Sequence, residues 1–254
     1  MEYALLSSNL NVKKVSEDAR KGVFEIEGLY AGYGLTIGNA LRRALLSSLP
    51  GAAVTYVKIK NAAHEFTTLP GVKEDGVELT LNMKKLRFRC FADEPQVLLV
   101  KIKGTGEVKG SDIALNSNVE LINPEQVIAT LTEKNAEFEA EFTVERGMGY
   151  SAVESRKAEK LAIGMIGVDA FFSPVTRVNF TVDNMRVGER TDYNRLRLEI
   201  ETDGTISPSS ALHKTSSILK DHFEKIFAVE VQDFEAAHKA EEEKPKKKAK
   251  KSKK

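Results

Sequence analysis

The sequence predicts an α+β protein, because many short alternating segments surround two separate helical segments. The clearest strand is AEFEAEFTVE, residues 136–145, whose phenylalanines, alanine and valine face one way and whose glutamates face the other. Such alternation is typical of an antiparallel strand with one solvated face. The helical segments are 32–51, which is apolar on most sides, and the segment that follows Ser207. We therefore expect antiparallel sheet with few helices.

The other expected strands share this alternation or a β-branched composition, and they occupy 21–29, 52–60, 87–91, 96–104, 119–123, 127–131, 175–188 and 195–204. Residues 61–76 predict a loop because they contain a Pro-Gly pair. Residues 77–84, VELTLNMK, alternate like a strand, and 151–165 follows no clear period.

Composition excludes several classes of protein. The 254 residues are 41% hydrophobic and 30% charged, as in ordinary globular proteins. No apolar run is long enough for a transmembrane helix, and the first residues do not resemble a signal peptide. The single cysteine, Cys90, excludes an internal disulfide and fits a reducing cytoplasm.

The charge is divided unevenly along the chain. Residues 235–254 hold nine lysines and four glutamates, and removing these from the totals of 38 basic and 37 acidic residues leaves a net charge of −4. A mildly acidic body argues against a protein that coats DNA. The tail predicts a disordered basic end, which either binds DNA phosphates loosely or only adds solubility.

The helical segment 32–51 has more apolar surface than a lone domain needs. On a helical wheel, Ile37, Leu41 and Leu45 belong to one broad arc, whereas Leu46 lies on the other side between Arg42 and Arg43. One interpretation is a core helix whose arginines reach water. The other is an interface helix, in which Leu46 and an arginine contact another subunit.

The last helix carries a second unpartnered stripe. Ser207 suits the N-cap and Pro208 the first helical position. Leu212, Leu219 and Ile226 then recur every seven residues, with Phe223 on the same side. This spacing is typical of a coiled-coil seam and favours contact with another helix.

The sequence shows no self-sufficient active site. The glycines of 32–38 lack the lysine of a P-loop and the spacing of a dinucleotide fingerprint. The histidines have no zinc-ligand spacing, and Cys90 is expected to be a buried, inert thiol. A nucleotide-binding enzyme that uses the Gly32–Gly38 loop, and a dimeric nucleic-acid-binding module, remain alternatives.

Four blocks together resemble a known family. They are GYGLTIGNALRRALLSSLPGAAV, HEFTTLPGVKEDGVELTLNMKKL, FFSPVTRVNFTVDNMRVGERTDYNRLRLEIETDGTISP and ALHKTSSILKDHF, in order between about residue 3 and 234. They are similar to the N-terminal domain of the α subunit of bacterial-type DNA-directed RNA polymerase. The resemblance implies a discontinuous α+β dimerisation domain, residues 1–49 and 170–234, and a mostly β insert domain, residues 50–169.

The resemblance also implies a function without catalysis in this chain. Family members form a homodimer that nucleates assembly of the β and then the β′ subunit for transcription. It implies that Arg43, Lys84 and Leu46 contact the β subunit. It implies that the dimer interface contains residues of both helices, namely Ile37, Leu41, Leu45, Leu212, Leu219, Phe223 and Ile226. It further implies that 77–84 is a short helix.

Cofactors and localisation follow from the same resemblance. No cofactor is expected in this chain, and the Mg²⁺ for nucleotidyl transfer is expected in the large subunits. We expect a cytoplasmic protein that is nucleoid-associated through the polymerase. Members usually continue into a C-terminal domain that binds promoter DNA. This sequence has the lysine-rich tail, residues 235–254, at that point, so either the sequence is shortened or the protein naturally lacks the domain. We therefore expect no promoter recognition from this chain.

Overall fold

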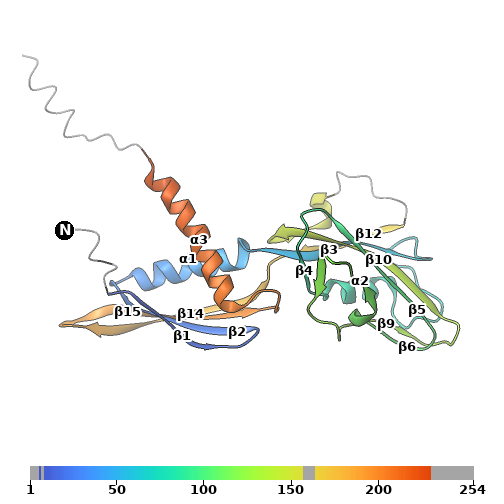
Figure 1. The fold of residues 1–254 in the computed structure, drawn as a ribbon, viewed down its shortest axis with the longest axis horizontal. Coiled ribbons are helices and arrows are strands. Elements are labelled where there is room, and N and C mark those ends of the chain that lie inside the picture. The colour runs from blue at the N-terminus through green and yellow to red at the C-terminus, as the bar shows by residue number, and fades with distance from the viewer. Residues whose placement is uncertain (1–5, 7–8, 157–163, 230–254) are drawn as a thin grey trace, which may run out of the picture. The chain divides into compact units, whose positions relative to one another are not determined.

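The computed structural model describes residues 6, 9–156 and 164–229 (Figure 1). The predicted disordered tail, 235–254, lies outside them. The strands are β1 Asn11–Glu17, β2 Lys21–Leu29, β3 Pro50–Ile59, β4 Phe88–Cys90, β5 Gln96–Lys103, β6 Gly106–Lys109, β7 Ile113–Ala114, β8 Val119–Leu121, β9 Val127–Leu131, β10 Glu137–Met148, β11 Tyr150–Ser151, β12 Met165–Gly167, β13 Ala170–Phe171, β14 Val175–Val187 and β15 Arg190–Thr202. The helices are α1 Tyr33–Ser47, α2 Gly76–Lys84 and α3 Pro208–Phe227, with short 3-10 helices η2 Gly110–Asp112 and η3 Val153–Arg156.

The predicted α+β class is confirmed, and each predicted strand overlaps an observed one. The sequence did not indicate β1, β6, β7, β11, β12 and β13. All but β1 are two to four residues long, too short to show a period. The described residues divide into two units between Ser217 and Ile218, within helix α3. The predicted domain boundaries stay predictions.

A four-stranded sheet in the first unit joins segments from far apart in the chain, in the order β1-β2-β15-β14. Facing residues in antiparallel strands share a face. The register therefore places one apolar row across all four strands, composed of Val12, Ile26, Leu196 and Val182. Ile26 and Leu196 are buried, but Val12, at the β1 end of this row, is 55% exposed.

Helix α1 covers this face of the four-stranded sheet (Figure 1). Two glycines let it approach closely. A Cβ on Gly34 would lie 2.6 Å from Val182 Cγ1, and one on Gly38 would lie 2.7 Å from the ring of Phe180. Both distances are far below van der Waals contact, so the helix backbone rests directly on the sheet side chains. The helix ends where Ser48 N bonds to the Ala44 carbonyl, shortly before Pro50.

A seven-stranded sheet uses the middle of the chain, in the order β7-β5-β10-β3-β4-β8, with β12 also paired to β3. Strand β10 confirms the predicted alternation, because its four apolar residues from Phe138 to Val144 are at most 1% exposed. They belong to a core that continues through strand β9 and helix α2.

The strand pattern of 77–84 is wrong, and the helix implied by the resemblance is confirmed. These residues form α2, which begins where the Asp75 carboxylate accepts a hydrogen bond of 2.7 Å from Glu78 N. Leu79 and Met83, four residues apart, are fully buried. Local alternation failed because burial of this one stripe decides the backbone conformation.

The outer face of the seven-stranded sheet carries an ion-pair ladder. Lys60 Nζ and Lys101 Nζ lie 3.0 and 2.9 Å from Glu139 Oε2, and both also approach Glu137. Hydrogen bonds from Lys101 and then Lys60 lower the pKa of Glu139. The hydrogen bond to Glu139 in turn raises the pKa of Lys60. The glutamate face predicted to be solvated is thus paired with lysines of both neighbouring strands.

These shifts predict a pH-dependent contribution to stability. A lowered carboxyl pKa stabilises the fold above the unfolded pKa, and the stabilisation is lost as pH falls through the folded pKa. A raised lysine pKa stabilises below its unfolded value and is lost as pH rises through the folded one. We expect Glu139→Gln to melt slightly below the unaltered protein at pH 7, and this difference in melting temperature to close as pH falls through the lowered pKa of Glu139.

Calorimetric melting across pH measures this effect. Glu145→Gln is the matched control, because Glu145 lies on the same strand and makes no ion pair among the described residues. The difference should also shrink in molar salt. If the difference in melting temperature persisted at acid pH, the ion pairs of Glu139 would not be its cause.

Candidate subunit interface

The described residues contain no group of three His, Cys, Asp or Glu side chains able to hold a metal. Residues of the Gly32–Gly38 loop also already have partners within the chain. The amides of Gly32 and Gly34 donate to Asn194 Oδ1 at 2.9 and 3.3 Å, and Gly34 and Gly38 are buried against the sheet. A phosphate cradle needs such amides free. The loop therefore serves packing, which disfavours the nucleotide-binding alternative.

Helix α1 divides into a covered and an uncovered side. Leu41 and Leu45 expose 5% and 0% of their surface, so they belong to the core of the single chain and leave a partner little to contact. Ile37, placed by the wheel at the centre of the core arc, is only half-buried, and so is Leu46. Leu35, which the wheel did not single out, is 64% exposed.

Arg42 and Arg43 are both exposed on the uncovered side of α1. Neither guanidinium makes an ion pair within 4 Å or a hydrogen bond in the part of the chain that the structure describes. The backbone at this point is secured, since Ser47 Oγ donates to the Arg43 carbonyl at 2.8 Å. Two cations beside the half-buried Leu46 are thus available to another molecule.

Helix α3 begins as the sequence predicts. Ser210 N donates to Ser207 Oγ at 3.3 Å, and a Cβ on Gly22 would lie 2.5 Å from Pro208 Cβ. Pro208, Ala211 and Thr215 are buried, which is a different stripe from the predicted seam. Leu212 of the seam is half-buried.

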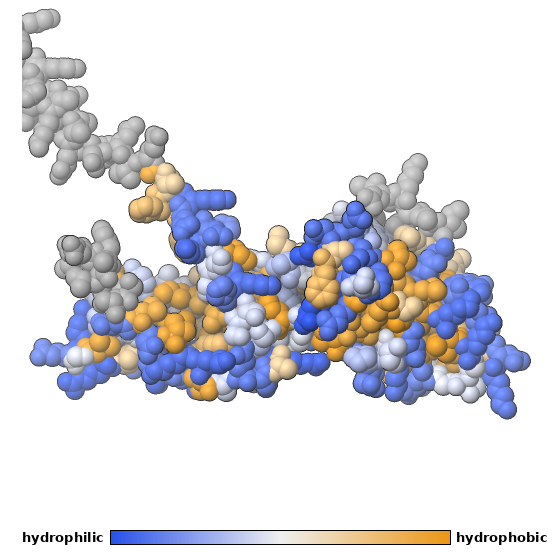
Figure 2. Space-filling model, viewed as in Figure 1, coloured by the Kyte–Doolittle hydropathy of each residue, from blue (hydrophilic) through white to orange (hydrophobic). Residues whose placement is uncertain are grey.

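The remaining seam residues lie in the second unit. Leu219 is half-buried, and Phe223 and Ile226 are 62% and 65% exposed. Phe227, at the end of the helix, is 92% exposed. Figure 2 shows hydrophobic surface at these last turns of α3. These large apolar side chains are therefore exposed to solvent in the second unit, at the seven-residue spacing noted in the sequence.

Lys84 ends α2 and faces a carboxylate rather than open water. Its Nζ lies 3.6 Å from Asp169 Oδ2, and both side chains are about one-third exposed. Asp169 also accepts a hydrogen bond of 3.0 Å from Val153 N. This bond lowers the pKa of Asp169 most, against an opposing effect of burial, and Tyr150 and Lys84 lower it further. Asp169 is therefore charged at neutral pH and holds Lys84 in place.

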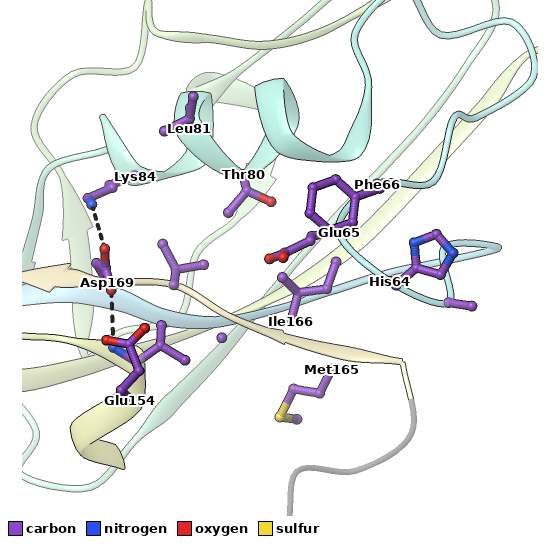
Figure 3. Close-up of a pocket in the computed structure, with 14 residues that line it drawn as sticks. His64, Glu65, Phe66, Thr80, Leu81, Lys84, Glu154, Met165, Ile166 and Asp169 are labelled. Atoms are coloured by element: carbon purple, nitrogen blue, oxygen red, sulfur yellow. Dashed lines mark hydrogen bonds and ion pairs between the residues drawn. The ribbon is translucent and has the colours of Figure 1, made fainter. Parts of the chain in front are cut away.

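The Lys84–Asp169 pair borders a cavity of about 550 Å³ (Figure 3). His64 and Phe66 lie at the opposite end of the cavity, and Leu81 of α2 lies along it. Phe66 and Leu81 are 72% and 51% exposed. Within the described residues, the His64 ring contacts Thr67 Oγ1 at 3.3 Å and is not paired with a carboxylate. The cavity combines apolar side chains with the Lys84–Asp169 pair and two further carboxylates, Glu65 and Glu154.

The end of α1 and the Lys84 cavity are joined by a short exposed surface. Met148 pairs with Pro50, which follows α1, and Tyr150 pairs with Phe171, two residues after Asp169. Met148, Tyr150 and Phe171 are 64%, 59% and 46% exposed, and we call them the Met148 patch. Sequence reasoning missed this patch because two-residue strands bring its members together. The Met148 patch therefore lies between the segment that follows α1 and the strand that follows Asp169.

Comparisons with known proteins identify the relatives of this chain. Residues 57–173 match the family model described as "RNA polymerase Rpb3/RpoA insert domain". A "DNA-directed RNA polymerase subunit alpha" of Moorella thermoacetica is 49% identical over 81% of this chain and 65% of its own length. The protein of that name from Symbiobacterium thermophilum is 49% identical over 83% and 66%. The chain spans about two thirds of the length of these relatives.

A third relative covers more of both chains. The "DNA-directed RNA polymerase subunit alpha" of Alkaliphilus metalliredigens is 42% identical over 94% of this chain and 76% of its own length. Identity at this level over most of two sequences shows common descent and a shared fold. The chain belongs to the family of α subunits of DNA-directed RNA polymerase.

Proposed function

We propose that this chain is a homodimeric scaffold that nucleates assembly of the β and β′ subunits of RNA polymerase, without contributing catalytic residues. The observation that carries the proposal is the uncovered side of α1, together with the seam of α3. These surfaces combine large apolar side chains with cations that have no intrachain partner among the described residues. Such composition is typical of protein interfaces.

For the dimer, the proposal uses the surface that the single chain leaves open. In the first unit this open surface contains Leu35 and Ile37 of α1, Leu212 of α3, and Val12 at the edge of the sheet. In the second unit, taken by itself, it contains Leu219, Phe223 and Ile226 of α3. An obligate pair is expected to bury more than about 2,000 Å². Leu41 and Leu45 are buried and hold α1 on its sheet, so they contribute to this surface indirectly by fixing the position of the helix.

We propose that the large subunits contact Arg43 and Leu46, the Met148 patch and Lys84. Arginine at such a site pairs with carboxylates or carbonyls through a planar fork, while its stem packs on apolar atoms. Mg²⁺ and nucleotidyl transfer are assigned to the large subunits. A cytoplasmic, nucleoid-associated location follows from this role.

Affinity purification of the chain from its native cell, followed by mass identification, tests the function. We expect a dimer that brings down two very large polypeptides in stoichiometric amount. Recovery of a monomer at micromolar concentration, with no large companion, would overturn the proposal.

Lys84→Ala should weaken capture of the β subunit without unfolding the chain. Loss of one partly exposed charge is expected to cost about 1 kcal/mol, roughly fivefold in affinity. Lys85→Ala is the matched control, because Lys85 is adjacent and exposed, and its side-chain ammonium donates to Asn82 Oδ1 at 3.2 Å. Capture is measured by titrating purified β subunit. Equal weakening by both variants would place the contact elsewhere.

A further inference from the structure

A second cavity, of about 250 Å³, lies where the start of β3, strands β4 and β10 and the first half of α3 meet. Three cations from three elements line it: Arg89 of β4, Arg146 of β10 and Lys214 of α3. None of its lining residues is acidic. Three like charges around one hollow repel each other, so the hollow attracts an anion.

The existing partners of these cations leave donors available. Arg89 Nε donates to the Thr205 carbonyl at 3.0 Å, and its Nη1 lies 2.7 Å from Glu120. Arg146 Nη1 lies 2.6 Å from Asp93. The two carboxylate side chains are 52% and 94% exposed, so these pairs are weak and easily exchanged.

The remaining nitrogen atoms of these cations are available to bind an anion. In the described part of the chain, the Nη2 atoms of Arg89 and Arg146 have no hydrogen-bond partner, and Lys214 makes no ion pair. Arg146 can present the N–H groups of its Nε and Nη2 to two oxygens of a phosphate, Arg89 can donate from Nη2, and the Lys214 ammonium adds a point charge. The exposed ring of Phe91 adds an apolar wall for a small substituent.

We propose that this cavity binds a small phosphate-bearing ligand of about the size of pyrophosphate. A concave site of this volume accepts a free phosphate group but not a nucleic-acid duplex. The ligand connects β4 of the seven-stranded sheet to α3, whose first turn packs on β2. Because it bridges these elements, binding stabilises the first unit and raises its melting temperature.

Cys90 supplies a direct readout, because it is the only cysteine of the chain and lines this cavity. The structure corrects the expectation of a buried thiol: Cys90 is half-buried, and its Sγ–H donates to the Ala92 carbonyl at 3.4 Å. Ligand in the cavity therefore shields a thiol that is otherwise accessible from it.

The test uses the full chain and pyrophosphate at constant ionic strength. We expect saturable slowing of the reaction of Cys90 with a thiol reagent, and a parallel rise in melting temperature. Arg146→Gln and Lys214→Gln should each weaken pyrophosphate binding about tenfold, as expected for loss of one charge-assisted bond. Both side chains are outside the core, so the variants should fold.

Arg195→Gln and Lys220→Gln are the matched controls, since each removes an exposed, singly paired cation that does not line the cavity. Unsaturable protection, or equal loss in the control variants, would show general screening and overturn the site. Protection by single-stranded DNA but not by pyrophosphate would also overturn it, by assigning these cations to a nucleic-acid backbone. Absence of both protection and thermal shift at millimolar pyrophosphate would do the same.

Discussion

Replacing Leu219 and Phe223 together with glutamate is expected to convert the dimer to monomers. Both residues lie on the seam of α3, where Phe223 is 62% exposed in the single chain. Covering two large apolar side chains contributes about 3–6 kcal/mol, roughly 10²–10⁴-fold in the dimer dissociation constant. Substitution by glutamate removes this contribution and adds charges that would have to be desolvated when the dimer forms. Analytical ultracentrifugation over a range of concentrations measures the change.

The matched control makes the same change in charge on the other side of the helix. Ser217→Glu with Lys225→Gln changes the charge by the same amount as the two glutamate substitutions, at exposed positions of α3 that point away from the seam at about 100° per residue. This variant should remain dimeric. A dimer that survives the Leu219 and Phe223 substitutions would exclude the seam as the dimer surface.

Arg43→Ala is expected to leave the dimer intact and to weaken capture of the β subunit strongly. Buried interface arginines are frequent hot spots, so the expected loss is about 2 kcal/mol, roughly thirtyfold. The fold should not suffer, because the guanidinium makes no ion pair in the described part of the chain and Arg43 is exposed. Capture of purified β subunit by preformed dimer, and the size of the free dimer, are measured in parallel.

Arg42→Ala provides the internal comparison for Arg43. The two arginines are adjacent, both exposed, and point to different sides of Leu46 along the helix. We expect the Arg42 variant to bind β subunit within a fewfold of the unaltered dimer. Dissociation of the dimer by Arg43→Ala would show that this arginine serves the twofold contact instead.

The sequence predicted the long elements well, because each has a period that burial enforces. Apolar and polar residues alternate along most of strand β10, and the apolar ones are the residues buried in the core. The four matching blocks also identified α2, where the local period misled. Short strands such as β12 and β13 carry no period, so they became visible only through their pairing.

The two arginines show the limit of reading one helix alone. The wheel placed them correctly on the side away from the core, but it centred the core arc on Ile37. In the fold that arc is centred on glycines, because Gly34 and Gly38 bring α1 onto Phe180 and Val182. A glycine has no hydrophobic side chain to signal burial, so the pattern could not reveal which residues the sheet covers.

By itself, the sequence determined most of the longer strands, the two long helices, the apolar spacing along α3 and the family. Those properties depend on local periodicity and on long shared blocks. Only the tertiary structure decided which apolar residues remain uncovered, and that Arg89, Arg146 and Lys214, separated by up to 125 positions, surround one cavity. The physical reason is that a surface is what remains after packing, and packing depends on contacts between segments far apart in the chain.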